Sequence, residues 1–106
     1  MLNIVIIGCG HIANDVHMPS ILKYIKENSG LKIAACADID ENRAISFAKK
    51  FNIDKYFLDY SEMLRTVRPD IAVCLVSPEK MADAAVDILN AGVHALIEKP
   101  PGLDTN

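Results

Sequence analysis

The first residues whose types and spacing could do chemistry form a glycine-rich turn near the N-terminus. Gly8 and Gly10 stand two residues apart after an apolar run, and the small residue Ala13 follows. Between a strand and a helix, such residues permit a tight turn, let the backbone approach a pyrophosphate, and keep the helix close to the strand. His11 and Ile12, inside the turn, are then expected beside the phosphates, with simple exposure as the alternative for His11. A tight turn without a ligand is the other interpretation, because this pattern alone is weak evidence.

The second candidate is Asp38, an acidic residue at the end of the second expected strand. A carboxylate at this position can accept hydrogen bonds from both hydroxyls of an adenosine ribose. It would also repel a 2′-phosphate, at a cost on the order of 4 kcal/mol for two unit charges about 4 Å apart. We therefore expect NAD as the cofactor rather than NADP. Arg43 is near enough in sequence to offset that repulsion, and an aspartate that only caps a turn or a helix is the alternative.

A lysine near the C-terminus is the third candidate. Lys99 comes directly before Pro100 and shortly after the last expected strand. It would therefore lie at the carboxyl edge of the sheet, where open α/β sheets bind their ligands. A solvated lysine at the end of a strand is the alternative.

These candidates need a framework that brings them to one edge of a sheet. Short runs rich in β-branched residues alternate with segments of helical periodicity. Pro19 interrupts the first helical segment, so we expect a bend there and a helix from about Ser20 to Asn28. We expect strands over 2–7, 31–37, 55–58, 71–76 and 94–97, and further helices over about 40–51, 61–65 and 79–91. This alternation predicts an α/β fold, a doubly wound, Rossmann-type parallel sheet with helices on both faces.

The composition is that of one globular domain over residues 1–106. The chain is 51% hydrophobic and 24% charged, with a formal net charge of −3. No basic run favours nucleic acid as a partner, and no apolar stretch has the length that crosses a bilayer. Met1 leads into a strand-like run without the pattern of a signal peptide, so we expect a cytoplasmic protein. The positions of Cys9, Cys36 and Cys74 in or just after apolar runs favour buried, reduced thiols over a three-cysteine metal site.

Several motifs together resemble the N-terminal domain of the glucose–fructose oxidoreductase and inositol dehydrogenase family, known as Gfo/Idh/MocA. The glycine turn is followed by His17-Met18-Pro19, where the family often has His-x-Pro, and Asp38 ends the second strand. The sequence DYSEML at 59–64 is similar to the tyrosine-led short helix of the family. Ser77-Pro78 stands where Thr-Pro is usual, and Glu98-Lys99-Pro100 matches the Glu-Lys-Pro signature. The resemblance covers essentially the whole chain, and the combination is far more specific than the glycine turn.

The resemblance implies roles for residues at the carboxyl edge of the sheet. The lysine of the signature lies beside the nicotinamide and the reacting carbon in such enzymes, so Lys99 would be catalytic and would also contact the cofactor. It would hydrogen-bond the substrate hydroxyl and stabilise alkoxide charge during hydride transfer. Ser77 and Pro78 would border the nicotinamide side of the cleft, and Glu98 would orient the lysine or the backbone. The implied enzyme is an NAD-dependent oxidoreductase that acts on a sugar, cyclitol or related polyol.

The chain departs from the family pattern in its cofactor contacts and in its length. Glu79 stands where an asparagine is frequent, and Met81 or Ala82 stands where a histidine would fall. Family chains are much longer and carry a second α/β domain, which supplies most of the substrate pocket. The sequence stops at Asn106, before the last strand of the sheet would be complete. We expect these residues alone to bind dinucleotide weakly, to be inactive, and to self-associate through the face that a second domain would cover.

Two other functions remain open from the sequence. One is a dinucleotide-binding or redox-sensing module without catalysis, which the short length favours. The other is an S-adenosylmethionine methyltransferase, which also uses a glycine-rich first turn and an acidic residue after the second strand. Such methyltransferases usually carry an acidic residue just before the first glycine, where this chain has Ile6 and Ile7.

Overall fold

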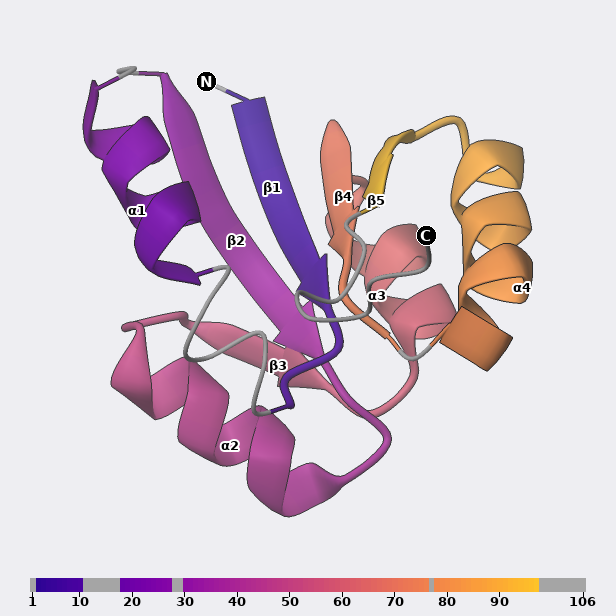
Figure 1. Ribbon diagram of the computed structural model, residues 1–106, viewed down its shortest axis with the longest axis horizontal. Helices are drawn as coiled ribbons and strands as arrows, with labels where there is room; N and C mark the ends of the chain where they lie inside the picture. The colour runs from indigo at the N-terminus through magenta and orange to yellow at the C-terminus, as the bar shows by residue number, and fades with distance from the viewer. Residues whose placement is uncertain (1, 11–17, 28–29, 77, 98–106) are drawn as a thin grey trace, which may run out of the picture.

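The strands that the computed structural model describes run parallel in one sheet (Figure 1). The described residues are 2–10, 18–27, 30–76 and 78–97. In chain order the strands are β1 (Leu2–Ile7), β2 (Leu31–Ala37), β3 (Lys55–Phe57), β4 (Ile71–Cys74) and β5 (His94–Ile97). Their order across the sheet is β3-β2-β1-β4-β5. The chain moves outward from β1 to β3 and then returns to the other side of β1. Parallel sheets whose strand order reverses in this way bind ligands at the carboxyl ends of their strands, beside the strand where the order reverses.

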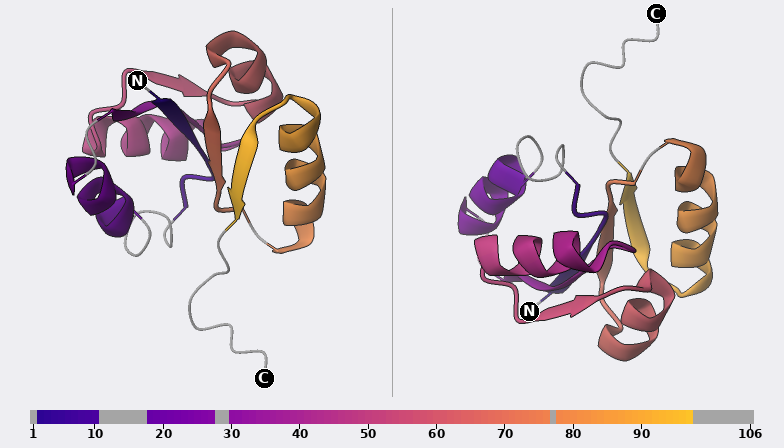
Figure 2. Two further views of the ribbon diagram at one scale, coloured as in Figure 1. Left: turned by 90° about the horizontal axis from the view of Figure 1, so that it is seen from above. Right: turned by 90° about the horizontal axis from the view of Figure 1, so that it is seen from below.

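Helices cover both faces of this sheet. They are α1 (Met18–Glu27), α2 (Glu41–Lys50), α3 (Tyr60–Val67) and α4 (Pro78–Asn90). Figures 1 and 2 show α1 and α2 on one face and α3 and α4 on the other. The prediction of a doubly wound α/β sheet is therefore confirmed.

Three element boundaries differ by two residues from those expected, and several others differ by one. Helix α1 begins at Met18 rather than near Ser20, because Pro19 falls in the first turn, where its missing N–H would have no partner within the helix. Strand β4 ends at Cys74, two residues early. Helix α3 extends to Val67 and ends where Arg68 takes the left-handed conformation, with φ of 51°. Boundaries of this kind depend on backbone contacts that side-chain periodicity does not record.

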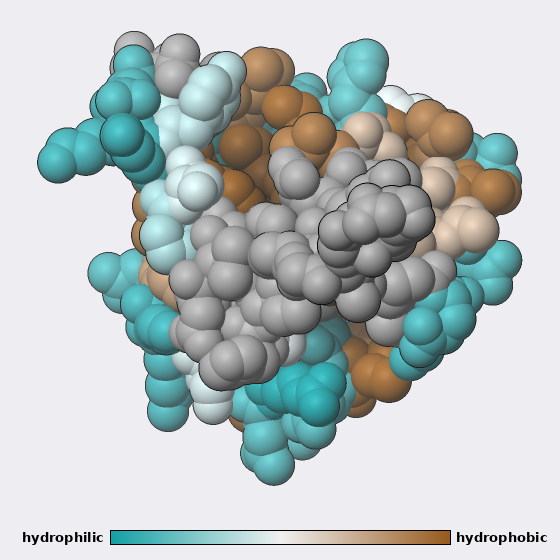
Figure 3. Space-filling view, in the orientation of Figure 1, coloured by the Kyte–Doolittle hydropathy of each residue, from teal (hydrophilic) through white to brown (hydrophobic). Residues whose placement is uncertain are grey.

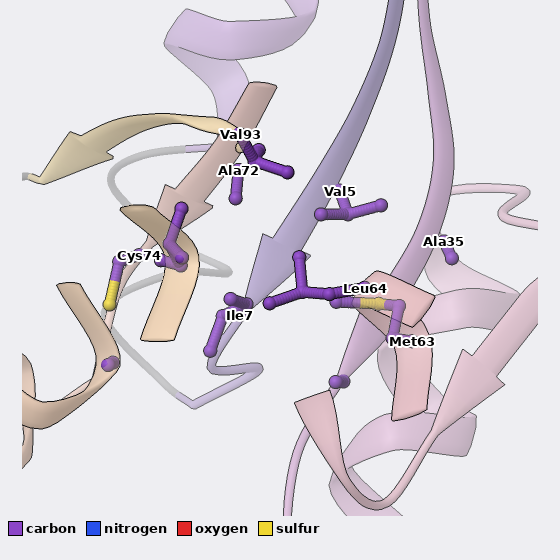
Figure 4. Packing of buried hydrophobic residues seen from close by; sticks show 11 residues of the cluster. Val5, Ile7, Ala35, Met63, Leu64, Ala72, Cys74 and Val93 are labelled. Atoms are coloured by element: carbon purple, nitrogen blue, oxygen red, sulfur yellow. The ribbon is translucent and has the colours of Figure 1, made fainter. Parts of the chain in front are cut away.

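Each face of the sheet has its own hydrophobic cluster. Alternate residues of a strand point to opposite faces, so Ile6 packs with Phe47 of α2 while Ile7 packs on the side of α3 and α4. Figure 4 shows Met63 and Leu64 of α3 close to Ile7 in this second cluster. Burying one such large side chain stabilises the fold by roughly 1.5–3 kcal/mol. The two clusters together fix the sheet whose carboxyl edge carries the candidate site.

Apolar side chains also reach the surface. Val86 and Leu89 of α4 and Leu96 of β5 are exposed, and brown areas appear at the upper edge and on the right-hand side of the face in Figure 3.

Among the described helices, none combines the length and the hydrophobicity needed to cross a membrane.

A side-chain hydrogen bond links α3 to α4. The phenolic O–H of Tyr60 donates to Oδ2 of Asp87 over 2.5 Å. Partial burial of the ring and this bond to a carboxylate raise the pKa of Tyr60 to about 12, from an ordinary value of 10.0. The folded protein therefore holds the phenolic proton more tightly than the unfolded chain does.

This pair predicts a loss of stability at alkaline pH. Because the pKa is raised by folding, the stabilisation is complete below pH 10.0 and disappears as the pH rises toward about 12. Urea midpoints measured across this range should fall less steeply for Tyr60→Phe than for the unmodified protein. The matched variant Tyr56→Phe removes an exposed tyrosine outside the pair and should keep the original pH dependence. Equal pH dependence in Tyr60→Phe and the unmodified protein would contradict this account.

Candidate functional site

The turn after β1 is held by backbone hydrogen bonds on two sides. The N–H of Gly8 donates to the carbonyl of Ala37 over 2.8 Å, and the N–H of Leu75 donates to the carbonyl of Ile7 over 2.7 Å. Gly8 has a φ of 98°, which side chains other than glycine rarely adopt. A Cβ at Gly8 would lie 2.9 Å from both the carbonyl carbon and the oxygen of Leu75. The fold itself therefore requires glycine at this position.

Gly10 has a different environment. Its φ lies outside the left-handed region, and a Cβ placed on it would meet no atom of the described residues within 4 Å. Neither backbone conformation nor packing against those residues calls for glycine here. Space that the described residues leave open beside Gly10 suits a close approach between the backbone and a ligand, as the sequence predicts for the second glycine of the turn.

Asp38 lies beside this turn, at the carboxyl end of β2. Its Oδ2 accepts a hydrogen bond from the N–H of Cys9 over 2.8 Å, and its Oδ1 accepts one from the N–H of Asp40 over 2.8 Å. The carboxylate is half-buried, and each of its oxygens has further acceptor capacity. Gly8, Gly10 and Asp38 are thus brought to the same edge of the sheet, although 28 or more residues separate the aspartate from the turn.

The start of α2 adds a second carboxylate next to Asp38. Asp40 is the N-cap of α2, and its Oδ1 accepts from the N–H of Arg43 over 3.2 Å. Its Oδ2 lies 4.0 Å from Nε of the same arginine. The sequence predicts an acidic start to this helix, but not that the residue capping it also contacts Asp38 and Arg43. The Asp-x-x-Arg spacing at 40–43 was the available signal for the cap and the ion pair.

The cysteines are buried thiols, as their positions in the sequence indicate. Cys9 and Cys36 belong to one hydrophobic cluster and Cys74 to the other. The neighbouring Cys36 thiol, together with burial, raises the pKa of the Cys9 thiol. Cys9 therefore contributes its backbone N–H to the site while its sulfur stays neutral. Within the described residues, no group of three or more His, Cys, Asp or Glu side chains could hold a metal ion.

Part of the predicted site lies outside the described residues: His11, Ile12 and Ala13 of the turn, Ser77, and Glu98, Lys99 and Pro100 of the signature. Pro78 is the first residue of α4, and Cys74, the last residue of β4, stands four positions before it. The described geometry therefore covers the adenosine and pyrophosphate half of the predicted site. The roles of the remaining residues stay predictions.

Comparison with known proteins identifies the family and the fold. Residues 2–106 match the family model described as "Oxidoreductase family, NAD-binding Rossmann fold". The chain is 31% identical over 103 residues to D-glucoside 3-dehydrogenase of Escherichia coli K12, covering 96% of this chain and 28% of that protein. The chain thus spans less than a third of the length of this relative.

Solved structures show the same fold. An oxidoreductase from Thermotoga maritima superposes with a TM-score of 0.83 at 28% identity, covering 97% of this chain and 31% of that one. The WlbA dehydrogenase from Chromobacterium violaceum, solved with NADH and UDP-GlcNAcA, superposes with a TM-score of 0.81 at 21% identity. That likeness covers 93% of this chain and 27% of the other.

Proposed function

Because this chain belongs to the Gfo/Idh/MocA oxidoreductase family, we propose that residues 1–106 form the dinucleotide-binding domain of an NAD-dependent dehydrogenase. The substrate class that we propose is a sugar, cyclitol or related polyol. The similar E. coli enzyme acts on a D-glucoside, as its name states, and the similar structure from C. violaceum was solved with a sugar nucleotide. The names of these two relatives support a substrate of the sugar class.

The observation that carries the proposal is the position of the Asp38 carboxylate. It is fixed beside the glycine turn by the N–H groups of Cys9 and Asp40. The acceptor capacity that remains on its oxygens suits the two hydroxyls of an adenosine ribose. The space beside Gly10, which no described residue fills, suits the pyrophosphate that follows the ribose. The residues present therefore fit NAD, and a negative charge beside the 2′-position disfavours NADP.

The proposed mechanism divides the chemistry between cofactor and protein. When bound, NAD supplies the nicotinamide ring that exchanges hydride with a carbinol carbon of the substrate. Lys99 is proposed to donate a hydrogen bond to the substrate oxygen and to stabilise its developing negative charge. Glu98 is proposed to orient Lys99, with Ser77 and Pro78 at the nicotinamide side. We propose that most of the substrate pocket comes from residues beyond these 106. Residues 1–106 by themselves would then bind dinucleotide without turnover.

A binding titration tests the proposal. The protein should bind NADH, followed by nicotinamide fluorescence and thermal shift, and should not respond to S-adenosylmethionine. Gly10→Ala should weaken NADH binding about tenfold, because a methyl group would enter the space left for the pyrophosphate. Its urea midpoint should stay unchanged, because no described atom lies within 4 Å of that methyl group. A response to S-adenosylmethionine alone would overturn the proposal.

A further inference from the structure

Three residues between the end of β2 and the first turn of α2 are linked by side-chain and backbone contacts next to the proposed ribose site. Asp38 accepts from the N–H of Asp40 over 2.8 Å. Asp40 in turn accepts from the N–H of Arg43 over 3.2 Å and lies 4.0 Å from its Nε. Asp40 is therefore the residue that connects the ribose-binding carboxylate to the nearest cation of α2.

Arg43 is the group on this helix that could favour a 2′-phosphate. A guanidinium near the end of β2 is the usual partner for that phosphate, and Arg binds phosphate through two parallel hydrogen bonds. In this structure its side chain lies against Asp40, and the two side chains are 60% and 47% exposed. The arginine therefore lies over the N-terminus of its own helix, with its charge partly neutralised.

We propose that Asp40 is a second specificity-determining residue, which disfavours NADP by its own charge and by holding Arg43 against itself. This inference rests on the proposed binding of NAD at Asp38. The charge of Asp40 adds to that of Asp38, whose carboxylate accepts the N–H of Asp40, so both would repel a 2′-phosphate bound beside Asp38. Because the ion pair is exposed, the contribution of Asp40 is moderate and is screened by salt.

Substitution of Asp40 by asparagine isolates the charge. Asparagine caps helices about as well as aspartate, so the variant Asp40→Asn keeps the acceptor for the N–H of Arg43 and the start of α2. The affinity for NADPH relative to NADH should rise by about fivefold at low salt and by less at high salt. Asp40→Ser, another good cap without charge, should give a similar shift.

A second substitution tests whether Arg43 causes the gain in NADPH affinity. A matched control tests whether loss of a carboxylate elsewhere has the same effect. In Asp40→Asn combined with Arg43→Gln, most of the gain in NADPH affinity should disappear. Asp70→Asn removes a carboxylate that accepts the N–H of Asn3 at the amino end of the strands, and should leave the NADPH to NADH ratio unchanged. Helical content, followed by circular dichroism, should be the same in all of these variants.

The outcomes separate this inference from the function on which it rests. If the unmodified protein binds NADH but the ratio is the same in Asp40→Asn and Asp40→Ser, the role of Asp40 is wrong and the proposed function stands. If the unmodified protein binds neither dinucleotide, the proposed function itself fails. A ratio that stays raised after Arg43→Gln overturns the part assigned to the arginine.

Discussion

Replacing Gly8 by alanine is expected to lower the free energy of unfolding by about 2–5 kcal/mol, a large part of the stability of a small domain. Two effects add. The φ of 98° is strained for any residue with a Cβ, and the new Cβ would lie 2.9 Å from backbone atoms of Leu75. The backbone of Leu75 cannot yield easily, because its N–H is bonded to the carbonyl of Ile7. Urea denaturation followed by circular dichroism measures the loss.

Gly30 provides the matched control for this substitution. It has nearly the same φ, 100°, but a Cβ there meets no atom of the described residues within 4 Å. Gly30→Ala should therefore cost only the backbone strain, roughly 1–2 kcal/mol. Equal losses in the two variants would show that the contact with Leu75 contributes nothing, and that the turn is looser than described.

Replacing Asp38 by alanine is expected to weaken NADH binding by about 10- to 100-fold, because hydrogen bonds from two ribose hydroxyls to a carboxylate are lost. The same change leaves the N–H groups of Cys9 and Asp40 without their acceptor. We therefore also expect a loss of about 1–3 kcal/mol in the free energy of unfolding. Fluorescence titration with NADH and urea denaturation measure the two effects separately.

A carboxylate at the opposite edge of the sheet serves as the control for Asp38. Asp70 accepts the N–H of Asn3 over 2.8 Å, so Asp70→Ala also removes a backbone acceptor. It should lower stability without changing NADH affinity. If Asp70→Ala weakened NADH binding as much as Asp38→Ala, the effect at Asp38 would be one of stability alone.

The sequence was a good guide to the order of the elements and a poorer guide to their junctions. Periodicity located the five strands, because buried parallel strands are continuous apolar runs. It placed the end of β4 too late, since Leu75 and Val76 are apolar although the strand ends at Cys74. It placed the start of α1 too late, since Pro19 is tolerated in a first helical turn.

In the candidate site, too, the sequence predicts side-chain types better than it predicts backbone contacts. Gly8, Gly10 and Asp38 could be selected from the sequence because their types and spacing match a dinucleotide-binding turn and the acidic residue after the second strand. The Leu75 backbone that a Cβ at position 8 would meet, and the bond from Cys9 to Asp38, could not, because each involves main-chain atoms that any residue carries. The link from Asp38 through Asp40 to Arg43 was missed for the same reason, since its first contact is a backbone N–H.

The hydrogen bond from the N–H of Cys9 to Asp38 has a consequence for the thermodynamics of ligand binding. The carboxylate is ordered by the protein's own amides, so its rotational freedom is lost during folding rather than when a ligand arrives. The bond also joins the parts of the site that would contact the ribose and the pyrophosphate. A ribose and a pyrophosphate would therefore each meet a carboxylate and a turn that folding has already ordered, and neither would have to order them for the other.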